Sequence, residues 1–244
     1  MSSTQTWADG PMVAFDLETT GPDPETALIV TASLVYVEPG QPPRTDDYLV
    51  DPGVEIPAGA TAVHGITTEH ARTHGERPAD VVGLLSGALA DANANGAPIV
   101  IYNAPYDLTV LERECVRHGQ YTLSEHCDES RLPLYVVDPL VLDKAVDRYR
   151  PGSRKLVDVA RHYGVPLSEK DAHTSSADAI TAARIAWKIA HQYPIGGSAP
   201  DVLMDYQVMQ YARQAASFED YLRRQGKLTE PISRDWPIRA AVRV

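Results

Sequence analysis

Cysteine, basic charge and long apolar runs are all scarce in this chain. Only two cysteines occur in 244 residues, Cys115 and Cys127, and they form no close-spaced pair. This usage predicts a reducing compartment and thiols without a structural role. No apolar run approaches the roughly 20 residues that span a bilayer, and residues 1–10 lack the basic and apolar pattern of a secretion signal. We therefore expect a cytoplasmic protein that has no membrane contact and begins with a flexible tail, residues 1–10.

Acidic side chains outnumber basic ones, 33 to 22, which gives a formal net charge of −11. This excess argues against a non-specific DNA-coating protein, which needs a broad basic surface. It leaves nucleic acid open as a substrate, because an acidic metal centre adds negative charge locally while a groove elsewhere stays basic. The length allows one sizeable core and a small appendage.

The order of the expected elements predicts an α/β fold with a mixed sheet flanked by helices. Three β-rich runs joined by turns come first and predict an antiparallel meander: 13–19, 28–37 and 47–50. Apolar strands then alternate with segments of helical periodicity: 78–94, 98–102, 104–118, 134–138, 139–146, 156–163 and 176–191. Residues 194–200 are typical of a linker, and 202–225 predict a further helix. We expect a domain at 11–193 and a linker with a helical C-terminal extension at 194–244.

The first strand carries the central motif. Its alternation directs Val13, Phe15 and Leu17 into a core and places Asp16 and Glu18 together on the opposite face. Two carboxylates fixed on one strand repel each other unless a cation lies between them, and hard cations such as Mg²⁺ take oxygen ligands. Taken alone, however, alternating acids on a strand are more often a solvated face. The motif therefore needs support from the rest of the chain.

A second acidic segment, Asn103 to Asp107, follows the apolar strand at 98–102. Asn103 is expected to cap the next helix. Asp107 then falls in its first turn, near a strand end where sites in open sheets gather. The alternative is that Asp107 only complements the helix dipole.

A third segment runs from His173 to Asp178. Within one ideal helix these two side chains would lie about 140° apart. If Ser175 or Ser176 caps the helix, His173 precedes it and is free to approach Asp178. The alternative is a capping box, in which Ser175 and Asp178 only satisfy the helix start.

Together the three segments resemble the motifs of the DnaQ-like exonuclease family, in its DEDDh branch of 3′→5′ exonucleases. Residues 15–21 resemble the first motif, 103–107 the second and 173–178 the third. The spacing of His173 and Asp178 separates this branch from the one that uses Tyr-x3-Asp. The segment 63–66 also resembles a family segment whose histidine lies near the bound strand.

The resemblance implies an RNase H-like fold and activity like that of the proofreading exonucleases of the DNA polymerase III epsilon type. It implies two Mg²⁺ ions, which Mn²⁺ can replace, and release of nucleoside 5′-monophosphates from the 3′ end of single-stranded DNA in proofreading or repair. The implied metal ligands are Asp16, Glu18, Asp107 and Asp178, with His173 as general base. The implied substrate-binding residues are Thr19, Thr20, His64, Asn103 and Tyr106.

Two other functions stay open at this stage. One is an exoribonuclease that trims RNA, because no residue decides whether a 2′-OH is required. The other is a catalytically silent nucleic-acid-binding module of the same fold. A polymerase partner is open too, although the aromatic stripe of the C-terminal helix favours packing on the core. The basic loop 148–155, with Tyr149, is expected either to follow the substrate backbone or to be a solvated loop.

Overall fold

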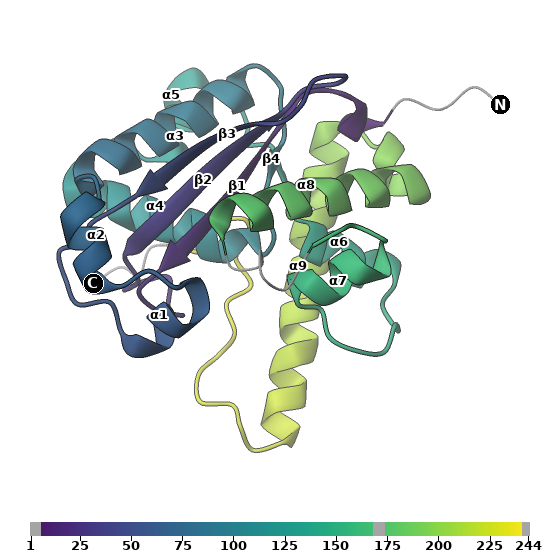
Figure 1. The fold of residues 1–244 in the computed structure, drawn as a ribbon. Coiled ribbons are helices and arrows are strands. Elements are labelled where there is room, and N and C mark those ends of the chain that lie inside the picture. The colour runs from purple at the N-terminus through teal and green to yellow at the C-terminus, as the bar shows by residue number, and fades with distance from the viewer. Residues whose placement is uncertain (1–5, 168–173, 241–244) are drawn as a thin grey trace.

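The computed structural model describes residues 6–167 and 174–240. Its centre is a five-stranded sheet in the order β3-β2-β1-β4-β5 (Figure 1). β1, β2 and β3 form an antiparallel meander, and β4 and β5 run parallel to β1. The predicted mixed sheet is confirmed. The strands are β1 (Met12–Thr19), β2 (Ile29–Val37), β3 (Arg44–Leu49), β4 (Ile99–Val100) and β5 (Val136–Val137).

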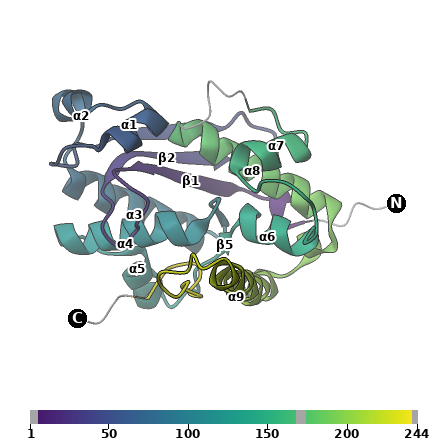
Figure 2. The same ribbon diagram turned by 90° about the horizontal axis from the view of Figure 1, so that it is seen from below.

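Helices cover both faces of this sheet (Figures 1 and 2). On one face Val13, Phe15 and Leu17 join a core with α3, α4 and α5, as their alternation predicts. On the other face Met12 and Ala14 pack beneath α8. Because helices cover both faces of the sheet, Asp16 and Glu18 do not lie on a solvated strand face. The interpretation of this acidic pair as a solvated face is therefore wrong. The covering helices are α3 (Pro78–Ala94), α4 (Ala104–His118), α5 (Leu123–Ser130) and α8 (Ser175–Gln192).

Two short helices, α1 (Ala58–His64) and α2 (Thr68–His74), follow β3. Gly65 ends α1 in the left-handed conformation with φ 78°, which glycine adopts without a steric cost. The Thr67 side chain caps α2 by accepting from the backbone N–H of His70 at 3.1 Å. This turn holds His64 at the end of α1, beside the sheet.

The expected capping role of Asn103 is wrong. Asn103 is exposed and left-handed, with φ 72°, and its side chain makes no capping hydrogen bond. The buried carboxylate of Asp138 accepts from the backbone N–H groups of Asn103 and Ala104 at 3.1 and 3.0 Å instead. Asp138 also caps α6 (Pro139–Val146) by accepting from Leu140. One carboxylate therefore fixes the starts of two helices.

The C-terminal part of the chain packs on the sheet. η2 (Pro194–Gly197) falls within the expected linker and leads into α9 (Pro200–Arg224). The Gln207 side chain of α9 accepts from the backbone N–H of Asp138 at 2.8 Å and donates to the carbonyl of Val136 at 2.9 Å. Beyond α9 the chain turns back toward α4 (Figure 1), and Trp236, only 7% exposed, enters the core.

Two small elements complete the fold: η1 (Trp7–Asp9) and α7 (Leu156–His162). η1 falls within the expected tail and packs on η2, where the Trp7 ring N–H donates to the carbonyl of Ile195 at 3.2 Å. Within the described ranges, no helix has the length and apolar character that crossing a membrane requires.

Candidate active site

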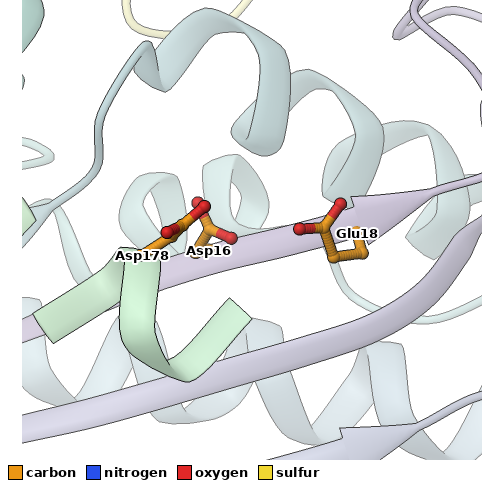
Figure 3. Close-up of side chains that lie close together, drawn as sticks. All are labelled: Asp16, Glu18 and Asp178. Atoms are coloured by element: carbon orange, nitrogen blue, oxygen red, sulfur yellow. The ribbon is translucent and has the colours of Figure 1, made fainter. Parts of the chain in front are cut away.

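Three carboxylates meet where α8 begins over the sheet. Asp16 and Glu18 project from β1 and Asp178 from the first turn of α8 (Figure 3), and one oxygen of each lies within 4.8 Å of the others. The start of α8 is held there by Ser175, whose hydroxyl lies 2.7 Å from the hydroxyl of Ser33 on β2. The fold thus brings together acids that stand 160 positions apart in the chain.

The geometry of the helix start rules out the capping-box interpretation of Asp178. Thr174 occupies the N-cap position and Ser175 is the first helical residue, with its hydroxyl turned to β2. Asp178 lies one turn into the helix, beside Asp16 and Glu18.

Burial and mutual repulsion raise the pKa values of this cluster. Burial is the largest cause for Asp16, and the neighbouring charges of Asp107, Asp178 and Glu18 raise its pKa further. Burial, and then the charge of Asp178, raises the pKa of Glu18 to about 7. Ionised carboxylates held this close are unfavourable without a counter-charge. The donor set therefore fits a divalent cation that takes oxygen ligands.

Asp107 approaches the same place from α4 but does not belong to the group of three. It is buried, and its Oδ1 accepts from the backbone N–H of Leu17 at 3.0 Å, between Asp16 and Glu18. Burial raises the pKa of Asp107, and the bond from Leu17 opposes that shift. This hydrogen bond fixes the fourth predicted acid, Asp107, against β1. Asp107 therefore does more than complement the helix dipole, which was the alternative.

A cavity of about 320 Å³ adjoins the carboxylates. Glu18, His64, Ile66 and Thr174 are among the residues that line it. His173, the predicted general base, lies outside the described residues and immediately precedes Thr174 in the sequence.

His64 is brought to this cavity in its neutral form. Its Nδ1 accepts from the backbone N–H of Ile66 at 3.1 Å, so the ring proton belongs on Nε2. Burial lowers the pKa of His64, and the nearby Thr19 backbone only partly offsets this effect. The ring is therefore a neutral hydrogen-bonding group beside Glu18.

Three other predicted substrate-binding side chains meet at the end of β1: Thr19 ends the strand, Thr20 begins the following turn and Tyr106 reaches this turn from α4. The hydroxyls of Thr19 and Tyr106 bond to each other, and both lie within hydrogen-bonding distance of the carbonyl of Gly21, Thr19 at 3.0 Å. With one proton on each hydroxyl, one of them donates to this carbonyl and the other donates to its hydroxyl neighbour. The Thr20 hydroxyl accepts from the backbone N–H of Leu28 at 3.0 Å. These bonds fix the turn at the end of the strand that carries the acids.

Sequence reasoning missed Asp138, which positions the helix carrying Asp107. An acid that follows a strand and precedes Pro139 is a typical helix start, and that signal was available. The basic loop was also misjudged in part. Arg150 and Arg154 are not solvated, because both bind the fully buried Asp143 at 2.5 Å.

A family model described as "Exonuclease" (RNase_T) matches residues 13–186. The chain belongs to this exonuclease family. The match takes in β1, α4 and the start of α8, the elements that carry the four acids. This match confirms the predicted resemblance to DnaQ-like exonucleases. The protein is a nuclease, and its acidic cluster is able to hold a metal ion.

Two curated relatives match the exonuclease. One is a DNA polymerase III subunit epsilon-like protein of Rhodobacter capsulatus, 32% identical over 174 residues, 70% of this chain and 22% of that protein. The other is the uncharacterized exonuclease CP81 of Escherichia phage 186, 30% identical over 189 residues, 70% of this chain and 84% of that protein. The chain thus spans about a fifth of one relative and most of the other.

Among solved structures, E. coli exonuclease I in complex with a dT13 oligonucleotide superposes with a TM-score of 0.63 at 19% identity. The match covers 81% of this chain and 43% of that one. A zinc-bound exonuclease I complex with single-stranded DNA gives a TM-score of 0.62, also at 19% identity, over 84% and 43% of the two chains. At this identity the likeness shows the fold, and the predicted RNase H-like architecture is confirmed.

Proposed function

We propose that this exonuclease removes nucleoside 5′-monophosphates from the 3′ end of single-stranded DNA, using two Mg²⁺ ions that Mn²⁺ can replace. The observation that carries the proposal is the convergence of Asp16, Glu18 and Asp178 within 4.8 Å in a half-buried, mutually repelling cluster. The family membership and the oligonucleotide bound to exonuclease I in the similar structure support it.

The carboxylates would divide between the two ions when these are bound. Asp16, Glu18 and Asp178 would hold one ion, and Asp107, whose Oδ1 is bonded to Leu17, would serve the second together with Asp16. When bound, such a pair of ions orients the attacking water and stabilises the charge that develops on the leaving oxygen of a phosphodiester.

The remaining site residues would accept a proton or position the substrate. His173 is proposed as the general base, because an unperturbed imidazole pKa near 6.5 suits proton removal at neutral pH. Its neighbour Thr174 lines the same cavity as Glu18, which supports this assignment. The residues proposed to seat the terminal nucleotide are Thr19, Thr20, His64, Asn103 and Tyr106.

The test uses the full chain with Mg²⁺ and one oligomer sequence made as DNA and as RNA, labelled at either end. We expect mononucleotides to leave the 3′ end of the DNA first. Asp16→Asn should lower the rate by about 10²–10³-fold, and the exposed Asp91→Asn should not change it. Full activity in a folded Asp16→Asn protein would overturn the proposal. Faster cleavage of RNA would favour an exoribonuclease, and binding without cleavage would favour a silent module.

The cellular role that we propose is proofreading or repair in the cytoplasm, with a polymerase as the partner class. The epsilon-like relative supports this proposal. Residues 11–193 would form the exonuclease domain, and 194–244 a linker and helical extension. Co-purification of the full chain with the polymerases of its source cell tests the partner, and recovery of the chain alone would contradict it.

A further inference from the structure

A basic groove of about 630 Å³ lies between α6 and α9, outside the acidic cluster. Lys144 and Arg148 line it from α6 and the following loop, and Arg213 and Arg224 line it from α9, with no acidic residue among the described residues of the lining. The whole chain has three acids for every two bases, so this surface reverses the overall charge balance. Burial lowers the pKa of Lys144, because the groove holds this cation partly away from water.

The four groove cations are available to an external anion. None of them forms an ion pair with a residue in the described part of the chain, whereas the nearby acids are already occupied. Asp143 binds Arg150 and Arg154, both at 2.5 Å. On α9, Glu219 binds Arg223 at 2.6 Å, and neither residue lines the groove. The local ion pairs thus fix the walls and leave the groove positive.

Two aromatic side chains complete the lining. Phe218 and Tyr221 are 53% and 50% exposed, and their rings lie nearly parallel, 14° apart, with centroids 6.5 Å from each other. Both share one face of α9 with Arg213 and Arg224. Aromatic rings between unpaired cations are the combination that binds single strands, because phosphates meet the charges while bases stack on the rings.

The groove lies close enough to the acids for one short strand to reach both. α6 begins at Asp138, whose carboxylate binds the first residues of α4, the helix that carries Asp107. α6 has eight residues, a length of about 12 Å, and Lys144 lies in its last turn. Lys144, on the α6 side of the groove, therefore lies within the span of a few nucleotides from Asp107. Figure 2 shows α6 and α9 side by side.

We propose that this groove binds the single-stranded nucleic acid on the 5′ side of the 3′ end that is being cut. The inference rests on the proposed exonuclease function. Lys144, Arg148, Arg213 and Arg224 bind phosphates, and the bases stack on Phe218 and Tyr221. Longer substrates are therefore held at two places, the acidic cluster and the groove.

The test compares cleavage of the dinucleotide dT2, which is too short to reach the groove, with cleavage of dT20. Arg213→Glu and Arg224→Glu should each lower the ratio of kcat/KM for dT20 to that for dT2 at least about fivefold, since each removes phosphate contacts. Arg184→Glu, an equal charge reversal at an exposed position of α8 outside the groove, is the matched control. We expect it to keep the wild-type ratio.

Equilibrium binding of fluorescein-labelled dT20 is measured in an Asp16→Asn background, where cleavage does not interfere. Each groove arginine replaced should reduce the slope of log K against log salt by about 0.7. The double variant Phe218→Ala/Tyr221→Ala should weaken binding at least about fivefold with the slope unchanged.

The outcomes separate this proposal from the exonuclease proposal. If cleavage proceeds and Arg213→Glu behaves like Arg184→Glu in both assays, the groove proposal is overturned while the exonuclease function stands. If wild type cleaves neither oligomer, the exonuclease proposal fails, and the altered salt slope still decides whether the groove binds the strand. If the aromatic variant binds dT20 as tightly as its parent, the groove is a general polyanion site and its assignment to nucleic acid is overturned.

Discussion

The backbone N–H of Leu17 donates a 3.0 Å hydrogen bond to Oδ1 of Asp107, which ties the first turn of α4 to β1 between Asp16 and Glu18. β4 pairs with β1 only nearer its start, so this carboxylate takes the place of a strand partner. Asp107 thus completes the backbone bonding of β1 and also adds negative charge beside Asp16.

Replacing Asp107 should separate these two contributions. Asp107→Asn retains an oxygen for Leu17 and removes the charge, so we expect nuclease activity to fall about 10²–10³-fold with little change in the free energy of unfolding. Asp107→Leu leaves the buried N–H of Leu17 without a partner and should also cost about 1–3 kcal/mol of stability. Urea denaturation and nucleotide release measure the two effects. Equal stability of the Asn and Leu variants would contradict this account.

The raised pKa of Glu18 predicts how the stability of the metal-free protein depends on pH. Its pKa rises from 4.5 to about 7 on folding, so between these pH values the folded protein keeps a proton that the unfolded chain has lost. Stability then falls as the pH rises through this window. The Tm in EDTA should drop between pH 5 and 8 in wild type and less in Glu18→Gln. Mg²⁺ should raise the wild-type Tm more at pH 8 than at pH 5. Parallel profiles for the two proteins would refute the prediction.

Asp138 should be a stability residue that touches no substrate. Its buried carboxylate accepts from the backbone N–H groups of Asn103, Ala104 and Leu140. Asp138→Ala leaves these donors unpaired and should cost about 2–4 kcal/mol, whereas the exposed Asp91→Ala should be neutral. Denaturant titration checks the order, and equal midpoints for the two variants would argue against it.

The C-terminal tail should contribute to the core through Trp236. The ring is 7% exposed and its N–H donates to Asp138 at 3.4 Å. Trp236→Ala should cost about 3–5 kcal/mol, and Trp236→Phe, which keeps most of the burial, about 1 kcal/mol. Tyr149→Ala serves as the control, because Tyr149 is 87% exposed. A Trp236→Ala protein as stable as this control would show that the tail packs without stabilising the fold.

The parts of the fold and site that follow from local geometry were predictable. Alternation places Asp16 and Glu18 on one face of β1, and helical periodicity gives α3 and α8, because both patterns depend only on near neighbours in the chain. The assembly of Asp16 with Asp178 was expected from the family resemblance, since no local pattern relates residues so far apart.

What the sequence did not reveal depends on distant contacts. Asp138 caps α4 from 34 positions beyond Ala104. No spacing rule within α4 predicts this contact. The aromatic stripe of α9 was expected to pack on the core, and Tyr206 and Tyr211 do so. Phe218 and Tyr221 are half exposed instead. Periodicity shows which face of a helix is apolar but not how far along the helix a partner extends.

The amide of Gln207 also bears on how this sheet meets other chains. β5 is an outer strand, and an open edge presents backbone donors and acceptors that can pair with a strand of another molecule. Gln207 takes up the carbonyl of Val136 and the N–H of Asp138, as the peptide group of an added strand would. The opposite edge, β3, carries the ion pair of Arg44 and Asp46, whose charges favour water over a further strand. Both edges are thereby protected against intermolecular β-pairing, one by an amide and the other by charge.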